Sequence, residues 1–196
     1  MKLNSRCLPD LLFTVKDVAR VLKIGPASAR VLCSRYAQLG QIVRLRNDLY
    51  ILADRFPYID QLERYWIANR IQVPSYISLS TALNYYEMSE QMYRNRIESV
   101  AQKRSIEYSV RDWQFKYHCL KSEYYRGFTL ENGVFIAEVA KALADIIYFC
   151  SIGRYAFDFH ALEWERLDWN KVDQWLKLFP SQTQHWWEKH GSFTKT

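Results

Sequence analysis

The 196-residue chain is 49% hydrophobic and 16% aromatic, which supports a packed core and excludes an intrinsically disordered protein. Its four cysteines form no CxxC pair, so neither a disulfide framework nor a four-cysteine zinc site is expected and a reducing cytoplasm is favoured. The start of the chain lacks the apolar core of a signal peptide, and charges interrupt the most apolar later stretch, residues 135–150, so no membrane span is expected.

The net charge of +6 lies entirely at the N-terminal end of the sequence. Residues 1–55 contain ten Lys or Arg and four Asp or Glu, whereas residues 56–196 contain seventeen of each sign. No acidic residue occurs from position 18 to position 47. This asymmetry predicts a polyanion-binding module joined to a neutral one.

The stretch "FTVKDVARVLKI" predicts a helix. Thr14 is placed to cap its first turn and Asp17 to complete a capping box. We expect Gly25 to end this helix in the left-handed conformation and Pro26 to begin a second one. The first helix has an apolar stripe at helical spacing, formed by Val15, Val18, Ala19 and Leu22. Two helices joined by a tight glycine turn predict a helix-turn-helix.

The second helix of this pair has two contrasting faces. One is apolar and suits packing on a neighbouring helix: Ala29, Leu32, Cys33, Tyr36 and Leu39. The other is short, polar and cationic, as a surface facing phosphates requires, because a carboxylate there would repel the nucleic-acid backbone. We therefore predict a recognition helix that contacts DNA through Ser28, Arg30, Ser34, Arg35 and Gln38.

The next stretch, "QIVRLRNDLYIL", predicts a hairpin. Alternation places Val43 and Leu45 on one face and Arg44 and Arg46 on the other. Directly after a recognition helix, such a hairpin is typical of the wing of a winged helix, with Asn47 at its tip, although an ordinary surface hairpin would give the same pattern. Duplex DNA is favoured over RNA, because a helix fits the DNA major groove and not the narrow A-form groove.

Pro57 and the change in charge balance place a domain junction between Ala53 and Ile59. We therefore predict a winged helix-turn-helix domain at residues 1–56 and a second domain at residues 57–196. In the second domain, "IDQLERYWIANRI" predicts an amphipathic helix. "VPSYISLSTALNYYEM" predicts a short extended segment and a helix capped at Ser80.

Further along, the stretches "NRIESVAQ", "RSIEYSV" and "WQFKYHCL" alternate at period two and predict a β-meander. Asn132-Gly133 predicts a hairpin. A helix is expected from Glu138 to Cys150, followed by two closing helices, the first capped at Asp168 or Asn170 and the second at Ser181. The predicted fold of this domain is α+β, with a small antiparallel sheet flanked by helices.

No catalytic motif accompanies these elements. The sequence contains no GxSxG, HExxH, glycine-rich phosphate loop or paired CxxC, and its four histidines are isolated. We therefore expect no catalytic residue, no metal site and no cofactor. Aromatic residues crowd the last third of the chain and could stack on single-stranded nucleic acid, but no basic groove accompanies them.

A polar stripe on the helix at residues 138–150 is the remaining candidate site. Lys141, Asp145 and Tyr148 lie at i, i+4 and i+7. This pattern indicates either a functional surface or the solvated face of an amphipathic helix.

Two stretches resemble the AbiE-type antitoxins of bacterial abortive-infection systems. "PSYISLSTALNYY" is similar to the family's proline–serine–tyrosine segment, and "FIAEVAKALADIIYF" to its characteristic helix. The sequence departs from the family at Asn47-Asp48, where a glycine is often found, and at Val139, where a proline–glutamate pair is more usual. The matching positions are Ser75, Tyr76, Ser78, Thr81, Ala82, Lys141, Ala142, Leu143 and Asp145.

The resemblance implies a cytoplasmic antitoxin that binds operator DNA, represses its own operon and counteracts a nucleotidyltransferase-type toxin, often without a tight complex. The expected antitoxin surface comprises Lys141, Asp145, Tyr148, Ser75 and Tyr76. Alternatives are a plain winged-helix regulator with a dimerisation or ligand-sensing domain, and an RNA-binding protein. The sequence leaves open whether the protein binds DNA as a homodimer or cooperatively.

Overall fold

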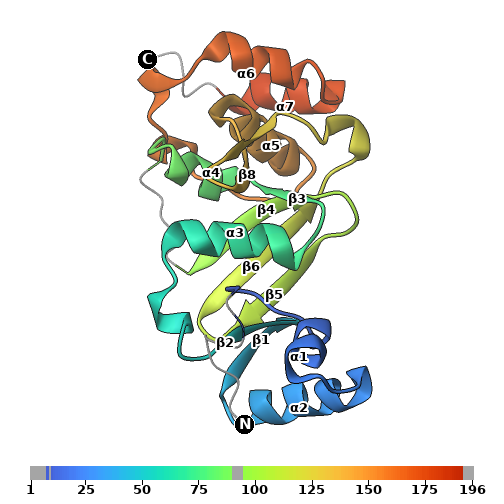
Figure 1. The fold of residues 1–196 in the computed structure, drawn as a ribbon. Helices are drawn as coiled ribbons and strands as arrows, with labels where there is room; N and C mark the ends of the chain where they lie inside the picture. The colour runs from blue at the N-terminus through green and yellow to red at the C-terminus, as the bar shows by residue number, and fades with distance from the viewer. Residues whose placement is uncertain (1–7, 9, 90–94, 192–196) are drawn as a thin grey trace.

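The computed structural model describes residues 8, 10–89 and 95–191 of the chain (Figure 1). These residues form seven α-helices and two sheets, so the α+β class predicted from the sequence is confirmed. One sheet has two strands, β1 and β2, and the other has six strands in the order β5-β6-β4-β3-β8-β7.

The N-terminal elements follow the predicted order of helix, helix and hairpin. They are α1 (Val15–Leu22), α2 (Pro26–Gln38), β1 (Ile42–Arg46) and β2 (Leu49–Leu52). The capping box of Thr14 and Asp17 is present, and Pro26 begins α2. The predicted role of Gly25 is wrong: Lys23 takes the left-handed conformation that ends α1 (φ 54°), and Gly25 is the N-cap of α2 with φ −66°.

Helix α2 packs its predicted apolar face on α1 and the hairpin. Ala29 and Cys33 are fully buried, and Leu32 and Tyr36 are partly buried. Leu39 is 67% exposed, contrary to the prediction, and lies one residue beyond the end of α2 at Gln38.

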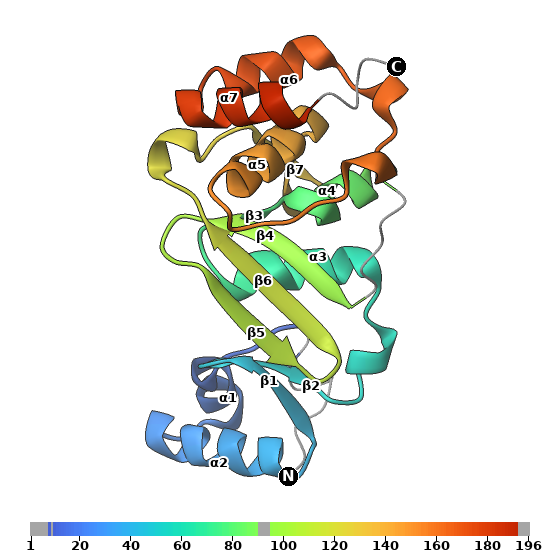
Figure 2. The same ribbon diagram turned by 180° about the vertical axis from the view of Figure 1, so that it is seen from behind.

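The β1–β2 hairpin lies between two hydrophobic cores. Ile42, Tyr50 and Leu52 pack with α1 and α2 in the smaller core. Alternate residues on the other face join the larger core of the molecule: Val43, Leu45, Leu49 and Ile51. Figures 1 and 2 show the hairpin between the two N-terminal helices and the end of β5. Residues on both faces of the hairpin therefore join a core, whereas the sequence predicted burial of one face only, and Arg44 is exposed as predicted.

The larger part of the molecule contains five helices and six strands. The helices are α3 (Gln61–Ile71), α4 (Leu79–Tyr85), α5 (Val139–Ser151), α6 (Trp169–Leu176) and α7 (Ser181–His190). The strands are β3 (Ser75–Ile77), β4 (Arg96–Ala101), β5 (Ile106–Val110), β6 (Trp113–Cys119), β7 (Phe128–Glu131) and β8 (Val134–Ala137). Four short 3₁₀ helices connect them: Phe56–Tyr58, Ser122–Tyr124, Phe159–Ala161 and Trp164–Arg166.

The six-stranded sheet differs from the predicted small antiparallel sheet. Strand β6 turns back from β5 and inserts between β5 and β4, so β4 and β6 are parallel and the three strands do not form a meander. Strands β3 and β8 are also parallel. The alternation in each stretch predicted a strand correctly, but it carries no information on which strand becomes its neighbour.

The local signals for turns and caps are mostly confirmed. Asn132 and Gly133 join β7 to β8 with φ of 50° and 80°, as the Asn-Gly pair predicted. Asp168 caps α6, one of its two predicted caps. Two predicted caps are wrong: α4 begins after Ser78 and not Ser80, and α7 begins after Pro180, so that Ser181 is its first residue.

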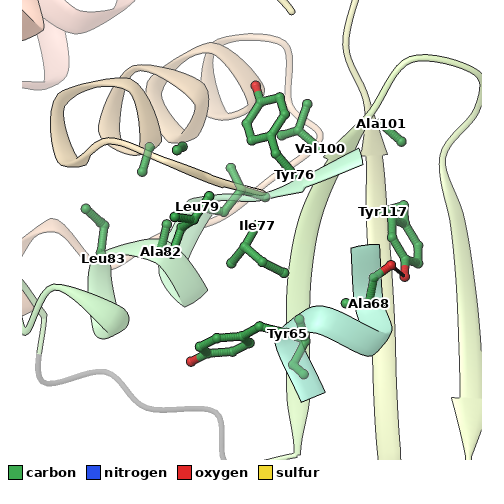
Figure 3. Packing of buried hydrophobic residues seen from close by; sticks show 14 of the residues in the cluster. Tyr65, Ala68, Tyr76, Ile77, Leu79, Ala82, Leu83, Val100, Ala101 and Tyr117 are labelled. Carbon is green, nitrogen blue, oxygen red and sulfur yellow. Dashed lines mark hydrogen bonds between the residues drawn. The ribbon is translucent and has the colours of Figure 1, made fainter. Parts of the chain in front are cut away.

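Helices cover the two faces of the large sheet unequally. Helix α3 packs across one face, where the hydroxyl of Tyr117 on β6 donates to the carbonyl of Ala68 at 2.7 Å (Figure 3). Helices α4 and α5 pack together near β3, and α6 and α7 lie beyond α5 (Figures 1 and 2). No helix of the described residues is long and apolar enough to cross a membrane.

Because both cores share the hairpin, the substitution Ile51→Ala should destabilise the whole molecule. Ile51 is fully buried, and its truncation should lower the free energy of unfolding by about 2–5 kcal/mol. All seven tryptophans lie beyond residue 56, so their fluorescence reports on the larger core, whereas circular dichroism reports on the helices of both parts. We expect both signals to shift together in urea titrations. A shift in circular dichroism with unchanged tryptophan fluorescence would contradict the shared core.

Candidate nucleic-acid interface and buried polar networks

The outward face of α2 carries all five helix residues predicted to contact DNA. Ser28, Arg30, Ser34, Arg35 and Gln38 are all exposed. Val31, 60% exposed, lies among them and adds an apolar contact surface. The acid-free surface predicted from the sequence is therefore accessible to a partner.

The hairpin turn is held together by its own arginines. Arg44 donates from Nη2 to Oδ1 of Asn47 at 2.9 Å, and Arg46 donates from Nη1 to the Asn47 carbonyl at 3.0 Å. Arg44 is exposed, whereas Arg46 is half-buried. The side-chain oxygen of Asn47 thus accepts a hydrogen bond within the turn. Of the two hairpin arginines predicted to contact DNA, Arg44 is the more accessible.

Asp48 fixes the turn to the first helix. It adopts the left-handed conformation with φ 58°. Its Oδ1 accepts a hydrogen bond from the backbone amide of Val15 at 2.9 Å. The turn of the hairpin therefore lies beside the N-terminal end of α1.

Helix α1 carries exposed cations beyond the residues that the sequence predicts to contact DNA. Lys16, Arg20 and Lys23 are exposed. Asp17, the single acid of this helix, accepts from the amide and hydroxyl of Thr14 and pairs with Arg20 at 2.9 Å. The sequence did contain a signal for these cations: the stretch without acidic residues, positions 18 to 47, includes most of α1 as well as α2.

The predicted antitoxin surface is not a surface. Lys141, Asp145 and Tyr76 are fully buried, and Tyr148 and Ser75 are 8% and 5% exposed. Ten of the thirteen residues of α5 are buried, because α4, α6 and α7 pack around it. The reading of this stripe as solvated or functional surface is therefore wrong.

Three of these residues, Tyr76, Lys141 and Asp145, form a buried polar network with Ser78 between β3 and α5. Ser75 lies outside this network and donates to the Gln72 carbonyl at 2.6 Å. Asp145 accepts from the hydroxyls of Tyr76 and Ser78 at 3.0 and 2.8 Å and forms an ion pair with Lys141. Lys141 also donates to the Tyr76 hydroxyl at 3.1 Å. Figure 3 shows Tyr76 and Ile77 projecting to opposite sides of β3. The two stretches that carry the family resemblance thus meet at this network.

Burial sets the electrostatics of the network. Desolvation lowers the pKa of Lys141 and raises that of Asp145, although each charge favours the ionised form of the other. Burial, followed by the charge of Asp145, holds the pKa of Tyr76 well above its usual value. The rings of Tyr76, Trp175 and Phe179 lie 5.3–5.7 Å from the Lys141 ammonium. The network is enclosed, which suits a structural role.

A second polar cluster surrounds Glu98, which is 1% exposed. Its Oε2 accepts from the hydroxyls of Ser80 and Tyr155 at 2.7 and 2.5 Å, and its Oε1 lies 3.9 Å from Nε2 of His118. Desolvation, and then the nearby cations Lys116 and Arg96, lower the pKa of His118 to about 4. The imidazole forms no hydrogen bond with Glu98 through Nε2, and burial dominates the shift of the His118 pKa. His118 is therefore neutral at physiological pH.

Among the described residues, no group of three or more His, Cys, Asp or Glu side chains could hold a metal ion. The chain matches no protein-family model, and no curated protein is found to be a relative of it. A proposal for the function therefore depends on the geometry of the described residues and on the sequence patterns.

Substitution of Lys141 tests the structural role of the first network. Lys141→Met leaves the Asp145 carboxylate buried without its cation, and this should cost about 3–5 kcal/mol of unfolding free energy in urea titrations. Adding Asp145→Leu removes the orphaned charge and should recover part of the loss. The control Lys177→Met removes an exposed lysine and should cost less than about 0.5 kcal/mol. Equal costs for Lys141→Met and the control would contradict this account.

The lowered pKa of His118 predicts acid sensitivity. The unfolded chain binds a proton at this residue near pH 6.5, whereas the folded chain does so only near pH 4. The contribution of neutral His118 to the free energy of unfolding is therefore fully present above pH 6.5. It falls by up to about 3 kcal/mol as the pH drops toward 4. His118→Gln should flatten this part of the stability–pH curve, and His160→Gln, at an exposed position, should not. Identical curves for both variants would rule out His118 as the cause.

Proposed function

We propose that the protein is a DNA-binding transcriptional autorepressor and the antitoxin of an AbiE-type toxin–antitoxin system. The observation that carries the DNA-binding part is the exposed, acid-free face of α2 on the segment that holds the whole net charge. The antitoxin part depends on the resemblance to the AbiE-type family. The proposed cellular partners are duplex operator DNA and a nucleotidyltransferase-type toxin.

The proposed docking places α2 in the major groove of the operator. In this arrangement, α1, α2 and the β1–β2 hairpin act as a winged helix-turn-helix. Arg30 and Ser34 contact base edges, and Arg35 and Arg44 contact phosphates. Arg46 contributes less than the sequence predicted, because it is half-buried and bonded to the turn. Lys16, Arg20 and Lys23 extend the positive surface along α1.

The second part of the chain, residues 57–196, is proposed to carry the antitoxin activity. Since the Lys141 network is enclosed, its contribution to this activity is to fix β3 against α5, and toxin recognition uses other side chains. The hairpin supplies four residues to the larger core, so a chain that begins at residue 57 would lose part of that core. Full-length variants are therefore the appropriate test of both activities.

Base readout by Arg30 is tested with full-length protein and a duplex from the promoter of its own gene. Arg30→Ala should weaken cognate binding by about 1–3 kcal/mol and reduce discrimination against random duplexes, measured by fluorescence anisotropy. Arg44→Ala should weaken both duplexes about equally and reduce the salt slope by roughly one. Lys177→Ala removes the same charge just beyond the end of α6 and should change neither. The reverse assignment of Arg30 and Arg44 would overturn the proposed docking.

The variant Arg30→Ala also separates repression from antitoxin activity. In cells that express the cognate toxin, it should relieve repression of a promoter reporter and still rescue growth. Rescue depends on folded protein, so Lys141→Met should reduce rescue in proportion to the loss of folded protein. If wild-type protein represses but never rescues growth, the plain-regulator alternative holds and the antitoxin proposal fails.

A further inference from the structure

One face of the large sheet is polar although the strands are central to the fold. Arg96 and Glu98 of β4 pair in register with Gln114 and Lys116 of β6, so these four side chains share a face. The opposite face carries Ile97, Phe115 and Tyr117, which pack against the α3 side. Figure 2 looks onto the polar face, with α3 behind the strands and no helix over the lower parts of β5 and β6.

Two adjoining cavities open on this polar face. One has a volume of about 490 Å³ and is lined by His118 and Glu107, among others, and the second, of about 400 Å³, is lined by Arg96, Glu98 and Tyr155. Both are lined by Lys116 and Arg154, which join them. Each volume lies in the range of about 300–1,000 Å³ that small-molecule sites occupy.

Buried hydrogen-bonding groups form the floor of the cavities. Among the described residues, Nε2 of His118 has no hydrogen-bond partner, although the side chain is only 6% exposed. A buried polar atom without a partner is costly and requires an explanation. The two hydroxyls that reach Glu98 both bond to Oε2, so Oε1 remains directed toward the same imidazole.

The charges of the rim favour an anion. Arg96, Lys116 and Arg154 face the carboxylates of Glu98 and Glu107, and no salt bridge within the described chain involves Lys116 or Arg154. Arginine and lysine are the side chains that bind phosphate most effectively, and arginine can do so with two hydrogen bonds. A ligand that fits must therefore combine an anionic group with a hydrogen-bond donor for Glu98.

We propose that these joined cavities bind a small phosphorylated ligand, with its phosphate between Lys116 and Arg154 and a donor group directed to Glu98 and His118. A continuous nucleic-acid strand fits less well, because Glu98 and Glu107 would repel successive phosphates. The site lies on the six-stranded sheet and shares no residue with the proposed DNA interface. Its test is therefore independent of the proposed function.

Imidazole resonances provide a direct readout of binding. Of the four histidines, only His118 lines these cavities. Titration of the full-length protein with adenosine monophosphate should saturably shift the ring nitrogens of His118 in long-range ¹H–¹⁵N spectra and leave His160, His185 and His190 unchanged. Inorganic phosphate should compete at higher concentration, because it lacks the donor group.

The double variant Lys116→Gln/Arg154→Gln should weaken this binding at least about tenfold, since it removes two charge-assisted contacts. Lys177→Gln/Lys189→Gln removes two exposed lysines from the C-terminal helices and should leave the affinity unchanged. Should the first variant fail to fold, the wild-type titration decides alone. The proposal is overturned if neither phosphate compound shifts His118, if citrate binds as well as adenosine monophosphate, or if a single-stranded oligonucleotide binds more tightly than the mononucleotide.

Discussion

The buried carboxylate of Asp145 is the constraint around which the larger part of the molecule is organised. A fully buried charge is tolerated only when it is paired and hydrogen-bonded. Lys141 lies one helical turn away and supplies the countercharge, while Tyr76 and Ser78 supply two hydroxyl donors from β3 and its end. Any shift of α5 along β3 would break several of these bonds at once, so the network fixes the position of the helix on the sheet.

The start of α4 is held between this network and the Glu98 cluster. Ser78 donates to Asp145, whereas Ser80 donates to Glu98 and the hydroxyl of Thr81 accepts from the Glu98 amide. Leu79 lies between these serines with φ 56°, an unfavourable conformation for a leucine, and is fully buried. The hydrogen bonds on both sides and the packing of the side chain hold that conformation.

The N-terminal helices are connected to this framework through the hairpin. One face of the hairpin completes the core beneath α1 and α2, and the other packs on the larger core. Asp48 connects the hairpin turn to the first amide of α1. The outward face of α2 is thereby presented from elements packed in both cores, and the proposed docking of α2 in DNA depends on such placement. The two cavities beside β4, β5 and β6 share no residue with α1, α2 or the hairpin, and they can take a separate ligand.

The sequence by itself determined the features that depend on residues close together in the chain. The Thr14–Asp17 capping box, the Asn-Gly hairpin and the charge asymmetry arise from neighbouring residues, although the exact end of a helix does not, since the predicted roles of Gly25, Ser80 and Ser181 are wrong. The exposed face of α2 could be predicted for the same reason, since its period and composition lie within one helix. The tertiary structure alone decided that β6 inserts between β5 and β4, because alternation defines a strand and not its neighbours. It also decided that Lys141 and Asp145 are buried. An i, i+4 ion pair has the same spacing on a surface or in a core, and the partners that compensate its burial, Tyr76 and Ser78, lie more than sixty residues earlier in the chain.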